Sequence, residues 1–178
     1  RRIKMAWIFS LSAECGPEQK IAEQFSVHFD AIAWKLSNDC QVQCQTTLFQ
    51  DIDDNWWCRV ASDSLSEIGI ESPDAAYLMT ELGILLYQRL RSAPTYRFAM
   101  VGLEVDEFRT HSELLEDSPD LKFPGLVLSD AIWQSIDHPS TFRPFSTGYV
   151  WQPYEGEVYK PLVVSPLLKE RMNDLLVA

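Results

Sequence analysis

The chain has 178 residues, of which 46% are hydrophobic and 23% charged, and 15 Lys+Arg against 26 Asp+Glu give a net charge of −11. This composition is that of an ordinary globular protein, which excludes a disordered chain, a collagen and a coiled-coil rod. Nucleic acids and anionic membranes are bound largely through Lys and Arg, so the acidic balance disfavours both kinds of partner. We expect a folded acidic protein that binds neither.

Membrane-spanning and secreted proteins are disfavoured by separate observations. No stretch approaches the ~20 apolar residues that a membrane-spanning helix needs. The apolar stretch Ala6–Leu11 is shorter than the ~7–15-residue core of a signal peptide and is interrupted by Ser10. We therefore expect a cytoplasmic protein with reduced thiols.

The four cysteines, Cys15, Cys40, Cys44 and Cys58, allow two interpretations. A zinc site would combine the Cys40-x3-Cys44 pair with the other two thiols, but structural zinc sites usually have two pairs of ligands that are close in sequence. Small buried thiols are the favoured interpretation. We expect no metal ion and no other cofactor.

The first elements in chain order are a strand and a long helix. Ile3–Leu11 is short and mostly apolar, which favours a buried strand. Pro17 follows, and proline suits the first turn of a helix. Apolar residues then recur at a spacing of three or four, which predicts an amphipathic helix of about five turns. The apolar positions are Ile21, Phe25, Phe29, Ile32 and Leu36.

A hairpin, a second helix and a further strand are expected next. Polar and apolar residues alternate over Gln41–Phe49, Asp51–Asn55 favours a turn, and Trp56–Ala61 returns as a strand. Ser72 followed by proline and aspartate is a helix start with a capping hydroxyl, and we expect this helix to end near residue 92. Tyr96–Val105 is rich in strand-forming residues.

The order β-α-β-β-α-β predicts the fold class of this first half. It is the order of the ferredoxin-like arrangement, an antiparallel sheet with two helices on one face. We therefore expect an α+β protein with a ferredoxin-like core over residues 1–107. A flatter α+β variant is the alternative.

The remaining residues, 108–178, form a proline- and aromatic-rich extension. We expect an irregular α/β segment that packs on the core, so that 1–178 is a single domain. The short elements expected in it are a helical turn at Ser112–Asp117, an apolar run at Leu126–Leu128, a helix over Ser129–Ile136, a loose hairpin of Thr147–Trp151 with 158–159, and a last helix beginning at Pro166.

The acidic turn is a second candidate metal site. Asp51, Asp53 and Asn55 match the first three ligand positions of an EF-hand loop, whose oxygens bind calcium. The match then fails, because Trp56 occupies the position that needs glycine and Ser62 the position of the bidentate glutamate. A solvated hairpin turn is the favoured interpretation.

A second acidic stretch is the basis of an enzyme hypothesis. Glu104 and Asp106 would share one face of a strand, with Glu107 opposite or in the turn and His111 nearby. Carboxylates can divide acid and base work when their environments separate their pKa values. A solvated acidic rim is the competing interpretation, and the sequence contains neither a glycine-rich phosphate loop nor a Gly-x-Ser-x-Gly elbow.

Aromatic residues are abundant and suggest an interface. Neighbouring strand residues point to opposite faces, so Trp56 and Trp57 cannot both be buried on one face of a single sheet. Aromatic side chains are enriched in protein interfaces, although they can equally close the core under the extension. The candidate partner-binding residues are Trp56, Trp57, Phe145, Tyr149, Trp151 and Tyr154.

Two functional hypotheses follow. The first is a non-catalytic protein-interaction or regulatory domain that binds a protein partner, or itself as a homodimer, through an aromatic C-terminal surface. The alternative is a small enzyme with a carboxylate/histidine or divalent-metal site. The absence of catalytic motifs and the excess of aromatic residues favour the first.

Overall fold

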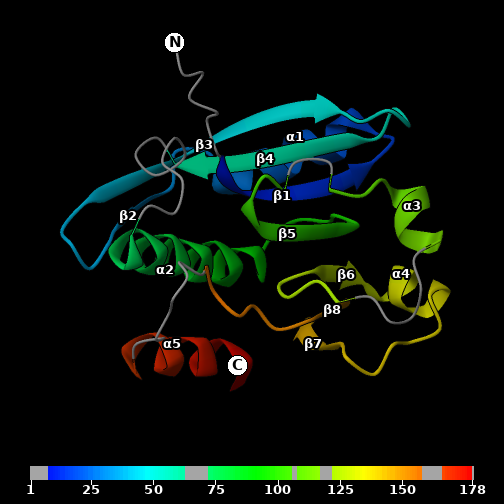
Figure 1. Ribbon diagram of the computed structural model, residues 1–178. Coiled ribbons are helices and arrows are strands. Elements are labelled where there is room, and N and C mark those ends of the chain that lie inside the picture. Colours follow the sequence, from blue (N-terminus) through cyan, green and yellow to red (C-terminus); the bar gives the residue numbers. More distant parts are fainter. Residues whose placement is uncertain (1–7, 63–71, 106–107, 117–121, 158–165, 178) are drawn as a thin grey trace, which may run out of the picture.

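The computed structural model describes residues 8–62, 72–105, 108–116, 122–157 and 166–177. Within these residues the chain is an α+β protein with one eight-stranded antiparallel sheet and five helices (Figure 1). The strands are β1 (Phe9–Gly16), β2 (Ala33–Lys35), β3 (Gln41–Gln50), β4 (Trp56–Ser62), β5 (Phe98–Leu103), β6 (Val127–Ser129), β7 (Arg143–Ser146) and β8 (Tyr149–Trp151). The helices are α1 (Gln19–Phe29), α2 (Pro73–Leu90), α3 (His111–Glu116), α4 (Asp130–Ser135) and α5 (Pro166–Val177).

The strands lie in the order β2-β3-β4-β1-β5-β6-β8-β7, so strands from both halves of the chain share one sheet. At its centre β1 pairs with β4 on one side and with β5 on the other. Leu11 of β1 is therefore flanked by Val60 and Val101. Because side chains alternate along a strand, this arrangement gives the sheet two distinct faces.

Each face of the sheet has its own hydrophobic core. The larger core contains Leu11 and is completed by buried residues of α1 and α2. The second core contains Trp57 and is completed by Leu114 of α3 and Ile132 of α4. The helices α3 and α4 lie at the right of Figure 1. Trp56 packs against the first core, so the two tryptophans lie on opposite faces as their neighbouring positions require.

The first strand ends later than predicted. β1 covers Phe9–Gly16, whereas the predicted strand covered Ile3–Leu11, of which 3–7 lie outside the described residues. The alternation of apolar and polar residues does not reveal where the strand ends, because its polar residues Ser12 and Glu14 are fully buried. The strand tolerates them because they lie on the second face, where Glu14 is paired with Arg97.

The first helix is shorter than predicted. α1 ends at Phe29, and Ala31 has a φ of 59°, which lies outside the right-handed helical region. The chain then forms β2, in which Trp34 pairs with Val42 of β3. The prediction of about five turns is wrong, because the residues that continue the helical spacing flank an edge strand instead.

The hairpin and the second helix are confirmed. β3 and β4 pair antiparallel from Cys44 opposite Ser62 to Gln50 opposite Trp56. α2 begins where predicted, and the Ser72 hydroxyl accepts a hydrogen bond from the Ala75 N–H (3.1 Å). The predicted strand over residues 96–105 is β5.

The extension has regular structure of its own. The predicted helices near 112–117, 129–136 and from residue 166 are confirmed as α3, α4 and α5. The predicted hairpin is corrected: β8 pairs with β6 and β7, and residues 158–159 lie outside the described residues. In the part of the chain that the structure describes, no helix has the length and apolar composition to cross a membrane.

Candidate functional site

The acidic turn is held together by its own hydrogen bonds. Asp51 Oδ1 accepts from the N–H groups of Asp53 (2.9 Å) and Asn55 (3.1 Å), and Asp51 Oδ2 accepts from Trp57 Nε1 (2.8 Å). Asp53 Oδ2 accepts from Ser112 Oγ (2.9 Å), which ties the turn to α3. Both carboxylates therefore have structural roles, and the described residues contain no group of three side chains suited to hold a metal ion.

The second acidic stretch does not assemble as one site among the described residues. Glu104 has a φ of 52°, and its Oε1 accepts from the N–H of Ile8 (2.8 Å), the residue just before β1. Asp106 and Glu107 lie outside the described residues. His111 begins α3 and lines a pocket to which Glu104 does not contribute.

This pocket lies where the segment just before β5 and the strands β6 and β8 meet α3 and α4, and its volume is about 430 Å³. Its polar lining includes Arg97 and His111, and its apolar walls include Leu115, Ile132 and the ring of Tyr149. The Tyr149 hydroxyl is occupied by the backbone of Tyr96, donating to its carbonyl (2.8 Å) and accepting from its N–H (3.1 Å).

Arg97 at this pocket is paired with a fully buried carboxylate. Its Nε donates to Glu14 Oε1 (2.8 Å) and its Nη2 donates to Glu14 Oε2. Glu14 Oε1 also accepts from the Gly16 N–H (2.5 Å). Burial raises the pKa of Glu14 above its usual range, although Arg97 acts in the opposite direction.

The pocket has the groups of a small polar binding site. Burial and the charge of Arg97 lower the pKa of His111, which favours the neutral imidazole, a form that can both accept and donate a hydrogen bond. The guanidinium charge of Arg97 is already compensated by Glu14. No residue that lines the pocket carries a carboxylate, so the pocket lacks the paired acids of the enzyme hypothesis.

The cysteines are free thiols in the interior or near it. Cys15, Cys44 and Cys58 are buried, and Cys40 is partly exposed. Burial raises the pKa of Cys58 to about 12 and raises that of Cys15 further. Because the thiolate is the reactive form, these buried thiols are poor nucleophiles.

We expect one fast-reacting thiol in the native protein. Brief treatment with iodoacetamide at pH 8 should add a single label at Cys40, and unfolding in guanidinium should expose all four cysteines. Intact mass followed by peptide mapping measures both. The Cys40→Ser variant should lose the fast label, and fast labelling of Cys15 or Cys58 would contradict the assigned burial.

Most of the predicted partner-binding aromatic residues lie in the interior. Trp57, Phe145, Trp151 and Tyr154 are each at most 5% exposed. Trp56 and Tyr149 are half-buried. A partner that docks on this surface without rearrangement therefore reaches only the latter two.

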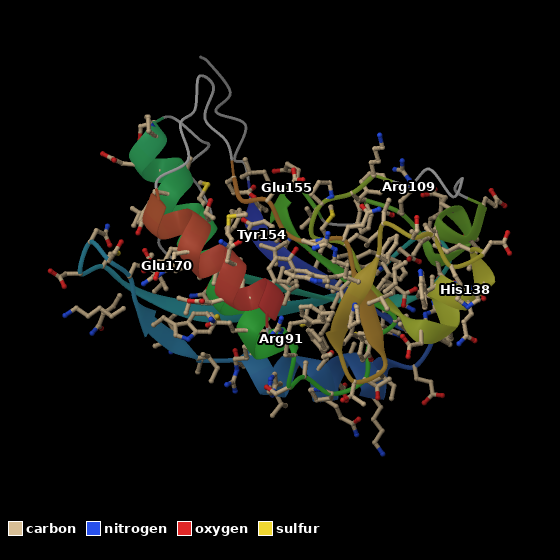
Figure 2. The ribbon with its side chains drawn as sticks, turned by 90° about the horizontal axis from the view of Figure 1, so that it is seen from below. Arg91, Arg109, His138, Tyr154, Glu155 and Glu170 are labelled. Atoms are coloured by element: carbon tan, nitrogen blue, oxygen red, sulfur yellow. The ribbon has the colours of Figure 1, made fainter. Side chains whose placement is uncertain are left out.

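Three of these aromatic residues, Phe145, Trp151 and Tyr154, pack around Tyr87 of α2. Its ring centroid lies 6.2 Å from that of Phe145, 5.2 Å from that of Trp151 and 5.0 Å from that of Tyr154. Figure 2 shows Tyr154 inside the molecule, with His138 at its periphery. The Tyr87 hydroxyl donates to the Gly125 carbonyl (2.6 Å) and accepts from the Val101 N–H (3.1 Å), which ties α2 to the extension.

The exposed main chain of β3 is a second candidate site. β2 covers only Gln41–Gln43, and the residues just before β2 bond Cys44 through the Ala31 N–H (3.2 Å) and the Ile32 carbonyl (2.8 Å). Because hydrogen-bonding direction alternates along a strand, the N–H and C=O groups of residues 46, 48 and 50 also point away from β4. These groups bond no described residue, and β3 forms the upper rim of the sheet in Figure 1.

The open stretch Gln45–Gln50, which we call the β3 edge, lacks the features that protect sheet edges. Charged residues, proline, bulges and very short strands are the usual protection. β2 has only three residues and ends in Lys35, and β7 contains Arg143, Pro144 and a register shift. β3, by contrast, is ten residues long and has no charged residue.

A signal for this edge was present in the sequence. Gln41–Gln50 is an uncharged segment in a chain of which 23% is charged. Its place at the rim of the sheet, however, depends on which strands pair, and that follows only from the fold. Comparison with protein-family models, with curated proteins and with solved structures finds no match to this chain.

Proposed function

We propose that this chain is a non-catalytic protein-interaction domain that binds an extended segment of a protein as an added strand at the β3 edge. One observation carries the proposal: the outward N–H and C=O groups of Thr46, Leu48 and Gln50 have no partner among the described residues, on a strand without charged residues. Strand addition satisfies such groups and gives affinity through the main chain. The proposal keeps an interaction role and moves the surface away from the buried aromatic residues.

The enzyme alternative has weaker support. His111 lies in a pocket with Arg97, which would suit recognition of a small polar ligand. The carboxylate of Glu104 does not line this pocket and accepts a hydrogen bond from the backbone N–H of Ile8 instead. A general acid/base pair therefore has no second member among the residues that line the pocket.

We also propose that the central strands are ferredoxin-like. The order β3-β4-β1-β5 is antiparallel throughout, with α1 between β1 and β3 and α2 between β4 and β5 in sequence. This supports the β-α-β-β-α-β arrangement, with β2 added beside β3 and three further strands beyond β5. The fold carries no function by itself.

Photo-crosslinking in the protein's own host tests the interaction proposal. A photoreactive amino acid at Gln45, exposed on the β3 edge, should give a covalent adduct with a protein. The same amino acid at Gln41, an exposed glutamine of the same strand beside β2, should give little or none. The two positions differ mainly in whether a strand can be added next to them.

A blocking variant makes the test specific. Leu48→Pro removes an N–H that points outward and leaves the ladder to β4 in place, since proline is tolerated on the open side of an edge strand. The adduct at Gln45 should disappear in this variant while the circular dichroism spectrum is retained. An equal adduct in both backgrounds, or none in either, would contradict the proposal.

A further inference from the structure

We infer that the segment added at the β3 edge is the β3 edge of a second copy of this chain, so that two sheets join across a two-fold axis. This inference rests on the proposed function and names its partner. Two edges of the same sequence can pair antiparallel in an isologous contact. In such a contact, if residue i of one copy opposes residue j of the other, residue j of the first also opposes residue i of the second, and only a residue on the axis opposes its own copy.

The direction of the main-chain groups restricts the register. Thr46, Leu48 and Gln50 present their N–H and C=O groups outward, so these residues must oppose one another across the axis. A register centred on Leu48 does so: Leu48 opposes Leu48, and Thr46 opposes Gln50 of the second copy. Each of these pairs exchanges two N–H···O bonds, which satisfies every open main-chain group of the β3 edge.

Side chains on both faces agree with this register. Leu48 packs partly against the larger core, so two such residues side by side extend that core across the axis. On the other face Phe49, stacked on Trp57 with ring centroids 6.1 Å apart, comes opposite Thr47 of the second copy. An aromatic residue beside a β-branched residue is a favourable cross-strand pair.

The same register explains an exposed apolar side chain. Ile52 follows the β3 edge and is 89% exposed, the highest value among the large hydrophobic residues that the structure describes. Continuing the pairing places Ile52 opposite Cys44 of the second copy. There Ala31 and Ile32 already occupy the edge, so Ile52 would pack against that segment and end the ladder.

The lack of charge on the β3 edge favours a second copy over a differently charged partner. A strand that selects a basic partner would carry acidic residues, and the β3 edge carries none. Two copies, each with a net charge of −11, repel at long range. This repulsion costs least when the two copies meet through an uncharged strand such as the β3 edge. Added salt screens the repulsion between the copies and should therefore strengthen the dimer.

A charge-swap experiment on the purified full chain tests both the partner and the register. The wild-type protein should sediment at twice the mass of the chain. Leu48→Lys alone and Leu48→Glu alone should each be monomeric, because like charges then face each other across the axis. Their equimolar mixture should restore a dimer that contains one chain of each kind. Gln41→Lys, on the part of the strand that β2 covers, should stay dimeric.

A second variant guards against a loss of folding, since Leu48 is partly buried. Thr46→Lys combined with Gln50→Lys leaves Leu48 in place, changes two polar residues, and again sets lysine against lysine, so it should also be monomeric. A monomeric wild-type chain, or a dimer that survives both lysine variants, would overturn the self-pairing. A monomer that still gives a Gln45 adduct with another protein would overturn only this inference, and the loss of both signals would overturn the proposed function as well.

Discussion

Replacing Arg97 by alanine is expected to lower the free energy of unfolding by about 3–5 kcal/mol, because it leaves the carboxylate of Glu14 buried and unpaired. Glu14 is 0% exposed, and both side-chain groups that donate to its carboxylate belong to Arg97. The remaining donor is the main-chain N–H of Gly16. The Arg97 side chain is 28% exposed, so water reaches it but does not reach its partner. The cost therefore comes from the stranded acid and not from the lost surface charge.

This penalty should depend on pH in a defined direction. Burial already raises the pKa of Glu14 above 4.5, and removing Arg97, which lowers it, raises it further. When a carboxyl group has a higher pKa in the folded state than in the unfolded state, its protonated form stabilises the fold. This contribution is complete at a pH below the pKa of the unfolded state and is lost as the pH rises through the pKa of the folded state. The destabilisation by Arg97→Ala should thus be smallest near pH 4.5 and grow toward neutral pH.

Urea unfolding of single and double variants measures this effect. Adding Glu14→Gln to Arg97→Ala removes the charge, and the double variant should recover at least about 1 kcal/mol at pH 7. Arg143→Ala, at an exposed arginine, should change the free energy of unfolding by no more than about 0.5 kcal/mol. Equal stability of the single and double variants at pH 7 would show that Glu14 is not an uncompensated charge.

Elements with a strong local signal could be predicted from the sequence. The alternation of Gln41–Phe49, the acidic turn after it and the Ser72 cap each determine a structure through neighbouring residues. Predictions were wrong where a distant residue decided the outcome. β1 accommodates Glu14 only because Arg97, 83 positions later, pairs with it. α1 ends at Phe29 because the next segment pairs with β3.

The candidate sites show the same limit. The prediction that Trp56 and Trp57 face opposite ways needed only the pleat of a strand. The burial of Trp151 and Tyr154 depended on Tyr87 of α2, more than 60 positions earlier, around which they pack. His111 was singled out beside acidic neighbours in sequence, but its pocket is shared with Arg97 through the fold. The sequence can single out aromatic and titratable residues as candidates, but whether each lies in the core or on the surface depends on the order of the strands in the sheet.

Replacing Gly125 by alanine is the second substitution expected to have a large effect, about 3 kcal/mol or more in the free energy of unfolding. Gly125 has a φ of 89°, which L side chains rarely adopt, and an added Cβ would collide with the Tyr87 hydroxyl and lie 3.2 Å from Tyr154 Cδ2. Relief by moving Tyr87 would break the hydrogen bond from its hydroxyl to the Gly125 carbonyl.

A matched glycine separates backbone strain from this overlap. Gly148 has a φ of 84° but nothing within 4 Å of an added Cβ, so Gly148→Ala should cost only about 1–2 kcal/mol. Tyr87→Phe, which removes the colliding oxygen, should cost less in the Gly125→Ala background than in the wild type. Thermal or urea unfolding of the four chains of this cycle gives the coupling. Equal costs at the two glycines, with no coupling to Tyr87, would mean that α2 does not hold the extension through this contact.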